Sequence, residues 1–414
     1  MKLMVYSHDA FGLGNIRRML AICESLLDVI PNVSILLLSG SSMLQSFRLP
    51  KGLDYIKLPC LNRSDSGGLS NKHLDVDVEM TLRLRSDIML AAVRNYQPDL
   101  FMVDKKPYGL RNELTTAIRH LKCTRPQTQL VLLLRDILDS PENTIKEWKD
   151  HNYFSALDLL YDRILVVGMQ EVFDVRQEYQ FPVDVASKVE FCGYIRKKPG
   201  QLSRSQIRKQ LSIPDNEKLV LVTPGGGEDG YQLVQHYLDG LQYRTETQNF
   251  QSMIVTGSEM NPVKRSKLHE HAHRIPHTQI IEFTNDLTSY IDAADLIVCM
   301  GGYNTITEVI SQEKRSISVP RVKPGHEQLL RTDRLHRLGL LHQLHPDRLT
   351  PKILFQTVTK ELDQSHPSRC SKLDFQGLSR VAKAISNLLS QKTAHASESI
   401  VQSSFCEPIW AEAQ

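Results

Sequence analysis

Short apolar runs rich in leucine and β-branched residues recur along the whole chain, and stretches with helical spacing lie between them. Runs of this length and composition predict buried strands. In the first half they are Lys2–Tyr6, Val33–Ser39, Asp54–Leu58, Leu100–Val103, Gln129–Leu134, Arg163–Val167 and Val189–Cys192. In the second half they are Lys218–Thr223, Gln251–Thr256, Gln279–Glu282, Leu296–Cys299 and Arg315–Val319. Strands that alternate with helices predict an α/β fold built on doubly wound parallel sheets.

The alternation is interrupted near the middle by residues 193–201, a basic segment with proline and glycine that is typical of an interdomain linker. A chain of 414 residues is also longer than one usual domain. We therefore expect one domain over residues 1–195 and a second over residues 202–375, followed by an amphipathic helix over 376–392. Residues 393–414 lack periodicity and predict a loose tail.

The composition is that of an ordinary globular protein, with 41% hydrophobic and 23% charged residues. A net charge of +3 without a long basic run argues against a nucleic-acid partner. The 7 cysteines are scattered without a C-x-x-C pair, which favours reduced thiols in a cytoplasm over disulfides or a zinc ribbon. Apolar runs stay below the roughly 20 residues of a membrane span, and Ser7-His8-Asp9 interrupts the N-terminal run below signal-peptide length. We expect a cytoplasmic protein without a transmembrane segment.

The most informative stretch runs from Ala293 to Gly339. The strand Leu296–Cys299 stops at Gly301-Gly302, where no side chain blocks the approach of a ligand to the backbone. Asn304 and Thr305 then offer side-chain oxygens for a helix start. A strand, a glycine turn and a helix N-terminus place free N–H groups and positive dipole at one point, which predicts a phosphate or diphosphate site.

A second strand and helix start face the same expected cleft, because the strand Arg315–Val319 is followed by a helix that opens with Glu327 and Gln328. One acidic residue of the first helix, Glu308, has two readings. It either contacts a ligand or completes a capping box with Thr305 at its own helix terminus. The spacing alone leaves these alternatives open, and Gln328 alone is more typical of a surface residue than of a ligand contact.

The stretch from Ile254 to Leu338 resembles the C-terminal half of family 28 glycosyltransferases, in which a G-G-x-x-T-x-x-E pattern is followed by proline and an acidic residue with glutamine. The resemblance implies a GT-B fold, in which two Rossmann-like domains face one cleft and a C-terminal helix crosses back onto the first domain. It implies that Gly301, Gly302, Asn304 and Thr305 line the diphosphate of a nucleotide sugar. It also implies that Glu308 binds the ribose hydroxyls and that Glu327 and Gln328 reach the sugar.

Two further donor contacts are expected. The loop Pro224–Gly230 follows a strand and is rich in glycine, so it is either an exposed turn or a part of the site. By resemblance, Gly225, Gly226 and Gly227 face the phosphates and the donor sugar. Phe283 is a candidate neighbour of uracil by the same resemblance, although a core position explains it equally well.

The acceptor side is expected at the N-terminal loop that holds Gly12, Gly14 and Asn15. This loop is not a dinucleotide fingerprint, because position 17 is arginine and no acidic residue closes the next strand. In related glycosyltransferases the last residue of such a loop is often a histidine base near the acceptor. Here Asn15 takes that place, and an amide cannot accept the proton.

Other residues at strand ends are therefore the candidates for the catalytic base and for acceptor contacts. His8 and Asp9 follow the first strand directly. Asp104 and Arg135 follow later strands whose carboxyl ends should meet at the same sheet edge. We name His8, Asp9 and Asp104 as catalytic candidates and Arg135 as an acceptor-side contact.

Two metal-like patterns are rejected. Asp75-Val76-Asp77 leads into a helical segment and does not close a strand, so it is not expected to bind a cation. The segment His269–His273 matches H-E-x-x-H, but its helix is charged on most faces and no third ligand in suitable context follows. No metal site and no cofactor are expected.

Together the residues and the resemblance predict a metal-independent, inverting glycosyltransferase that uses a nucleotide diphosphate-sugar, with UDP as the expected nucleotide. Two alternatives stay open: a sugar-nucleotide epimerase or hydrolase of the same fold, and a nucleotide-sugar-binding protein with impaired catalysis. The acceptor is an unidentified hydroxyl compound, either lipid-linked or a small glycan. Contact with anionic lipid at the inner membrane face is a further expectation, resting on Arg83, Arg85, Lys105 and Lys106.

Overall fold

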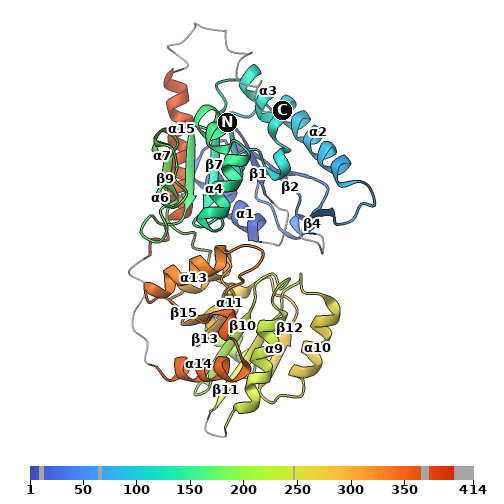
Figure 1. The fold of residues 1–414 in the computed structure, drawn as a ribbon, viewed down its shortest axis with the longest axis vertical. Helices are drawn as coiled ribbons and strands as arrows, with labels where there is room; N and C mark the ends of the chain where they lie inside the picture. Colours follow the sequence, from blue (N-terminus) through green and yellow to red (C-terminus); the bar gives the residue numbers. More distant parts are fainter. Residues whose placement is uncertain (9–13, 64–67, 246–247, 365–372, 396–414) are drawn as a thin grey trace.

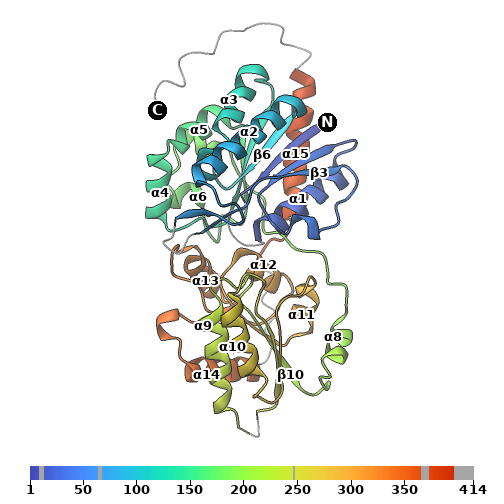
Figure 2. The same ribbon diagram turned by 90° about the vertical axis from the view of Figure 1, so that its right-hand side faces the viewer.

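The computed structural model describes residues 1–8, 14–63, 68–245, 248–364 and 373–395. These residues form two α/β domains that are stacked along the long axis of the molecule (Figures 1 and 2). Each domain is built on a parallel sheet, so the expected fold class is confirmed. The domain limits given above stay a prediction.

The N-terminal domain holds a seven-stranded sheet in the order β3-β2-β1-β6-β7-β8-β9. Every strand expected in this half is present, because each is a continuous apolar run that a parallel sheet buries on both faces. The strands are β1 (Lys2–Ser7), β2 (Ser34–Ser39), β3 (Leu53–Lys57), β6 (Leu100–Asp104), β7 (Gln129–Arg135), β8 (Arg163–Val167) and β9 (Val189–Phe191).

Helices cover both faces of this sheet. They are α1 (Gly14–Val29), α2 (Val78–Tyr96), α3 (Thr115–Thr124), α4 (Pro141–Asp150), α5 (Tyr153–Leu160), α6 (Val175–Glu178) and α7 (Val183–Ser187), with 3-10 turns η1 (Leu44–Ser46) and η2 (Leu110–Asn112). Successive residues of β1 point to opposite faces. Leu3 and Val5 therefore join the core formed with α1, whereas Met4 and Tyr6 join the core formed with α2 and α3.

The C-terminal domain holds a six-stranded parallel sheet in the order β12-β11-β10-β13-β14-β15. Its strands are β10 (Lys218–Thr223), β11 (Phe250–Val255), β12 (Thr278–Ile281), β13 (Leu296–Cys299), β14 (Ser316–Ser318) and β15 (His342–Gln343). Its helices are α8 (Arg204–Gln210), α9 (Tyr231–Gly240), α10 (Pro262–Ala272), α11 (Leu287–Ala293), α12 (Tyr303–Ser311), α13 (Glu327–Arg337) and α14 (Pro351–Asp363), with 3-10 turns η3 (Leu241–Tyr243) and η4 (Pro346–Arg348).

Three short strands were not expected. β4 (Leu61–Arg63) and β5 (Leu69–Asn71) form a small antiparallel pair between β3 and α2. The third is β15, which pairs with β14 over two residues. Strands this short carry too few residues for a recognisable periodicity.

The last helix, α15 (Gly377–His395), lies against the N-terminal domain although it follows the C-terminal domain in the chain (Figures 1 and 2). Its residues Val381 and Ile385 are buried in one core with Ile22 of α1. The Ser25 hydroxyl on α1 donates to the carbonyl of Leu378 at 3.3 Å. Among the described residues, none of the helices combines the length and the apolar character that crossing a bilayer requires.

A buried ion pair joins the two domains beside the strand ends. The guanidinium of Arg331 on α13 donates to both carboxylate oxygens of Asp136, which directly follows β7. Both side chains are 0% exposed. The Tyr303 hydroxyl on α12 also donates to the Val167 carbonyl of β8 at 2.8 Å. The carboxyl ends of both sheets therefore face each other across one fixed boundary, where ligands of such sheets bind.

Candidate active site

A cavity of about 300 Å³ lies between the domains, and both contribute residues to its wall. The N-terminal domain and the linker supply His8, Asn15, Arg17, Lys105, Arg135 and Lys197. The C-terminal domain supplies Thr223, Pro224, Gly225, Gly226, Gly227, Glu228, Asp229, Val255, Gly257, Ser258, Glu259, Phe283, Thr284, Leu287, Met300, Gly302, Tyr303, Asn304, Thr305, Glu308, Arg321, Glu327 and Gln328. Most of the site residues expected from the sequence are thus brought together.

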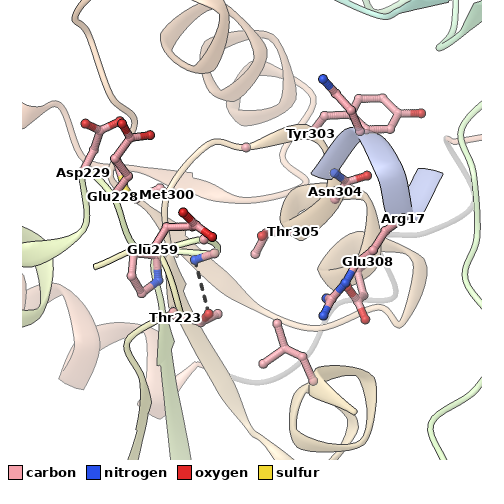
Figure 3. A pocket seen from close by; sticks show the side chains of 18 of the residues that line it. Arg17, Thr223, Glu228, Asp229, Glu259, Met300, Tyr303, Asn304, Thr305 and Glu308 are labelled. Carbon is pink, nitrogen blue, oxygen red and sulfur yellow. Dashed lines mark hydrogen bonds between the residues drawn. The ribbon is translucent and has the colours of Figure 1, made fainter. Parts of the chain in front are cut away.

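The N-terminus of α12 opens directly into this cavity. Gly302 is the N-cap residue and makes no side-chain capping bond. The first amides of a helix have no intrahelical partner, so those of Tyr303, Asn304 and Thr305 are available to an anion. Figure 3 shows the Thr305 side chain near the centre of the cavity, between Glu259 and Glu308.

The glycine loop after β10 faces this helix terminus. Gly225 has a left-handed backbone (φ +85°), and a Cβ there would lie 3.3 Å from the Thr305 hydroxyl. The Gly225 amide donates to the Thr223 hydroxyl at 3.3 Å, the bond drawn in Figure 3. Gly226 and Gly227 line the same wall. The loop and the helix terminus together therefore form a concave surface of backbone atoms.

Gly301 does not lie where the resemblance implied. It does not line the cavity, and its amide donates to the Gln328 side-chain oxygen at 3.1 Å in a buried position. The same oxygen accepts the Arg321 amide at 3.0 Å. Gln328 therefore uses its carbonyl to hold two loops, which leaves its amide nitrogen for a ligand. Gly301 supports the turn, and Gly302 with the first turn of α12 faces the cavity.

The capping-box reading of Glu308 is wrong. The helix begins at Tyr303, two residues earlier than Thr305, so Thr305 lies inside the first turn and Glu308 beyond it. The carboxylate of Glu308 accepts hydrogen bonds from the Thr288 hydroxyl on α11 and from the Lys197 ammonium in the linker. Glu308 is 2% exposed and lines the cavity. It lies about one helical turn from the N-terminus of α12, where the diphosphate is expected to bind.

Glu327 belongs to a group of charged side chains that extends across the domain boundary. Its carboxylate accepts from Arg135 of the N-terminal domain at 2.8 Å and from Arg321 at 3.3 Å. Burial by itself would raise the pKa of Glu327, but the positive charges of Arg135, Arg331, Lys105 and Arg321 outweigh it and lower the pKa to about 2. The residue is therefore ionised and already paired, so a sugar at this place would meet an organised carboxylate.

Because the pKa of Glu327 is lowered, the free energy of unfolding should depend on pH under acidic conditions. The folded-state pKa is below the ordinary value of 4.5, so the stabilisation is complete above about pH 4.5 and declines as the pH falls towards about 2. We expect the wild type to have a larger free energy of unfolding than Glu327→Gln near neutral pH. This difference should become smaller as the pH falls from about 4.5 towards about 2. Urea unfolding at a series of pH values measures it, with exposed Glu270→Gln on α10 as the control. A gap that stays constant with pH would contradict the lowered pKa.

Of the catalytic candidates that the structure describes, His8 and Asp104, only His8 lines the cavity. It is 5% exposed, and its Nδ1 has no hydrogen-bond partner among the described residues. Burial, together with the positive charges of Lys105, Lys106 and Arg135, lowers the pKa of His8 well below its ordinary value. Its imidazole is therefore neutral at neutral pH and able to accept a proton. The Asn15 side-chain amide donates to the His8 carbonyl at 2.5 Å and so holds the backbone of the residue that carries the ring.

Asp104 is placed as a structural residue. Its carboxylate is 1% exposed, pairs with Arg18 at 2.7 Å and accepts the His8 amide at 3.3 Å. It does not line the cavity, and its bond to the His8 amide instead holds the backbone of His8. The candidates Asp9 and Gly12 lie outside the described residues, and Gly14 begins α1.

Several cavity residues were missed as site residues. Three of them are basic: Lys197 in the linker, Arg17 at the start of α1 and Arg321 in a loop. The only signal in the sequence was a basic residue near a proline, a glycine or a helix terminus. The guanidinium of Arg17 lies over the exposed ring of Phe283 at 5.7 Å, across the domain boundary. Phe283 is 39% exposed and lines the cavity, so a core position is excluded for it.

The four basic residues expected to face lipid do not form one exposed patch. Arg85 is buried and pairs with Glu113 at 2.6 Å, while Lys105 lines the cavity. Lys106 pairs with Glu147. Of these four residues, Arg83 alone is exposed. For the two arginines on α2, the helical pattern did not show that Arg85 lies on the buried side of the helix and Arg83 on the exposed side.

The two metal-like patterns lie at α2 and on α10. Asp77 is the N-cap residue of α2, and His269 lies on α10 with its ring 6.5 Å from that of His273. Within the ranges that the structure describes, no group of three or more histidine, cysteine, aspartate or glutamate residues is arranged to hold a metal ion.

Comparison with known proteins finds a family match in the second half of the chain. Residues 219–388 match the glycosyltransferase family 28 C-terminal domain. An uncharacterized glycosyltransferase of Methanopyrus kandleri is 24% identical over 54% of this chain and 60% of its own length. A UDP-N-acetylglucosamine–N-acetylmuramyl-(pentapeptide) pyrophosphoryl-undecaprenol N-acetylglucosamine transferase of Acetivibrio thermocellus is 29% identical over 45% of this chain and 50% of its own length. The chain thus spans roughly half the length of these relatives.

Solved structures share the fold over nearly the whole chain. MurG of Acinetobacter baumannii has a TM-score of 0.57 at 14% identity, covering 94% of this chain and 99% of its own. A putative UDP-N-acetylglucosamine 2-epimerase of Listeria monocytogenes has a TM-score of 0.63 at 12% identity, covering 98% of this chain and 99% of its own. The GT-B fold is therefore confirmed, and the fold by itself does not separate transferases from epimerases.

Proposed function

We propose that this chain, whose second half carries a glycosyltransferase family 28 C-terminal domain, is a glycosyltransferase that moves a hexosyl group from a nucleotide diphosphate-sugar to a hydroxyl acceptor. One observation carries the proposal. The uncapped N-terminus of α12 and the buried carboxylate of Glu308, about one turn further along the same helix, open into the same interdomain cavity. This spacing suits a diphosphate and the ribose attached to it.

The expected nucleotide is UDP, with its base beside Phe283. In the proposed reaction the acceptor oxygen attacks the anomeric carbon while the bond from that carbon to the diphosphate oxygen breaks. The electron pair leaves with UDP, and the acceptor proton passes to the neutral imidazole of His8. Attack opposite the leaving group inverts the anomeric centre. Helix amides and the cations of the cavity stabilise the departing diphosphate, which is why the proposed reaction needs no metal.

The acceptor is proposed as a hydroxyl compound of the lipid-linked class, with small glycans as the rival class. The support is the printed name of the Acetivibrio thermocellus relative, which acts on a pyrophosphoryl-undecaprenol compound. With such an acceptor the protein would work from the cytoplasm at the inner membrane face. The acceptor groove would be the part of the cavity bounded by His8, Asn15 and Arg135.

Donor binding is tested by thermal and urea unfolding with a panel of nucleotide sugars. A ligand present at about 100 times its dissociation constant should add about 2.7 kcal/mol to the free energy of unfolding. We expect UDP-sugars to give this shift with the wild type and Glu308→Ala to lose most of it, because the ribose then lacks its acceptor. Exposed Glu270→Ala on α10 is the matched control and should respond as the wild type does. A panel without any shift, or an equal shift for Glu308→Ala, would contradict the proposal.

Turnover separates the three classes of function. Incubation with a UDP-sugar alone yields an epimer from an epimerase and free sugar from a hydrolase. A transferase instead releases stoichiometric UDP only when a lipid-linked or glycan acceptor is added. A binding protein gives the unfolding shift without any product. We expect UDP release that depends on acceptor.

A further inference from the structure

Among the described residues, the wall that the N-terminal domain contributes to the cavity carries cations but no carboxylate. Its charged side chains are Arg17, Lys105 and Arg135, and the described carboxylates of the cavity wall all belong to the C-terminal domain. Arg135 pairs with Glu327, and Arg17 lies over the ring of Phe283. Lys105 makes no ion pair and no side-chain hydrogen bond with any other residue that the structure describes. Its ammonium is therefore available to a ligand.

The backbone at Lys105 has a conformation that residues other than glycine rarely adopt. Its φ is +72°, in the left-handed region, directly after β6 ends at Asp104. The Lys105 amide donates to the Leu133 carbonyl of β7 at 2.9 Å. The Lys106 amide donates back to the Asp104 carbonyl at 2.9 Å, so two hydrogen bonds fix the bend. Strained backbone persists where the surrounding structure holds it, and it is concentrated at ligand sites. The bend places Lys105 in the cavity wall, whereas Lys106 pairs with Glu147 outside it.

Lys105 lies beside the proposed place of the donor sugar. The strands β1 and β6 are parallel neighbours with Tyr6 opposite Val103, so His8 and Lys105 follow the two strand ends at the same level. In the proposed reaction His8 takes the proton from the hydroxyl that attacks the anomeric carbon, so the sugar ring lies within reach of His8. The positive charge of Lys105 also acts on Glu327, as one of the charges that lower the pKa of that carboxylate. The sugar thus lies between these three side chains.

The charges around the sugar leave one cation without an anion. Burial and the positive charge of Arg135 lower the pKa of Lys105 to about 8, although the negative charge of Glu327 opposes them. Arg135 uses its Nη2 for Glu327, and its other side-chain nitrogens make no hydrogen bond to a described residue. The hydroxyls of a neutral hexose would not balance the charge of the partly buried ammonium. A carboxylate on the sugar would balance it and form a charge-assisted hydrogen bond.

We propose that Lys105 is a specificity-determining residue that binds the carboxylate of an acidic donor sugar, so that the preferred donor is a nucleotide-linked hexuronate. Arg135 is the second cation of this subsite. The inference rests on the proposed function, because it needs a donor diphosphate at the N-terminus of α12 and the sugar beside His8. It adds the class of sugar, which the fold and the family match leave open. The carboxylate of a hexuronate replaces the hydroxymethyl group at C6, so the anomeric carbon and the bonds that form and break are unchanged.

The test compares UDP-glucuronate with UDP-glucose and UDP-galacturonate with UDP-galactose, since the members of each pair differ only at C6. We expect the wild type to bind the uronate of at least one pair about 10- to 100-fold more tightly, the size of one charge-assisted hydrogen bond. Lys105→Met removes the ammonium and keeps an aliphatic side chain, so it should bind both members of that pair with similar affinity. UDP alone should bind the wild type and the variant equally. Calorimetry at pH 7 measures these affinities.

Two further variants complete the design. Lys105→Arg keeps the positive charge and should retain a preference for the uronate. Lys106→Met removes the neighbouring charge, which pairs with Glu147 and does not line the cavity, and should bind every ligand as the wild type does.

Three results would overturn the inference and leave the proposed function standing. Equal binding within both pairs by the wild type would assign the Lys105 ammonium to an anionic group of the acceptor instead. A preference that survives in Lys105→Met would assign the uronate contact to another cation. Weaker binding of UDP itself by Lys105→Met would place Lys105 at the diphosphate. A wild type that binds neither UDP nor any of the four UDP-sugars overturns the proposed function and the inference with it.

Discussion

Replacing Arg331 with methionine is expected to lower the free energy of unfolding by about 3–5 kcal/mol, the usual cost of breaking a buried ion pair by removing one partner. The guanidinium donates to Asp136 at 2.8 to 3.1 Å, and both side chains are 0% exposed. Its remaining donors reach the carbonyls of Gly301 and Ile137. Without the arginine, the Asp136 carboxylate stays buried without its positive partner. Urea unfolding followed by circular dichroism measures the change.

The double variant Arg331→Met with Asp136→Asn separates the charge from the packing. It removes both charges, so we expect it to recover a large part of the lost stability, since a buried amide costs less than an unpaired buried carboxylate. Arg337→Met on the same helix is the control. Its pair with Asp333 is an exposed i,i+4 contact, and it should cost no more than about 0.5 kcal/mol. A similar decrease in the free energy of unfolding for Arg331→Met and Arg337→Met would contradict a stabilising buried ion pair between the domains.

Replacing His8 with glutamine is expected to lower turnover about 10²- to 10⁴-fold, the range lost when a general base is removed, while donor binding is retained. The imidazole is buried at the wall of the cavity, with Nδ1 free of partners among the described residues. Its pKa is lowered by burial and by Lys105, Lys106 and Arg135. The base is active when neutral, so turnover should hold on acidification through the ordinary histidine pKa and fall only at lower pH. Acceptor-dependent UDP release at a series of pH values measures this.

The matched control is His120→Gln on α3, a residue that bonds to Thr124 of its own helix and does not line the cavity. It should leave both turnover and its pH profile unchanged. A His8→Gln variant with full turnover would move the base elsewhere, and Asp9, which follows it in the chain, would be the next candidate. Loss of donor binding in His8→Gln would instead place His8 among the nucleotide contacts.

The part of the site that follows local rules was predictable from the sequence. A strand that ends in glycine before an amphipathic helix determines a helix terminus at a sheet edge, whatever the rest of the chain does. Gly302, Asn304, Thr305 and Glu308 accordingly line the cavity. The alternative that made Thr305 the cap of α12 placed it three residues after Gly302, the observed N-cap residue. A Thr-x-x-Glu spacing fits a capping box equally well wherever the helix starts.

The rest of the site depends on pairings between distant parts of the chain. Glu308 and Lys197 are 111 residues apart, and Arg331 and Asp136 are 195 residues apart. No spacing rule in one sequence connects such residues. For the same reason Asp104, Arg85 and Gly301 were assigned to a ligand or to a surface, although their polar groups are used inside the protein.

The sequence by itself therefore determined the order of strands and helices, the two parallel sheets and the helix N-terminus that opens into the cavity, because hydrophobic periodicity and turn chemistry act over a few neighbouring residues. Only the tertiary structure decided which charges are buried, which of them pair across the domain boundary and which side chains remain free to meet a substrate. Burial and electrostatic pairing are set by distances in space, and those distances arise only when the two domains pack together.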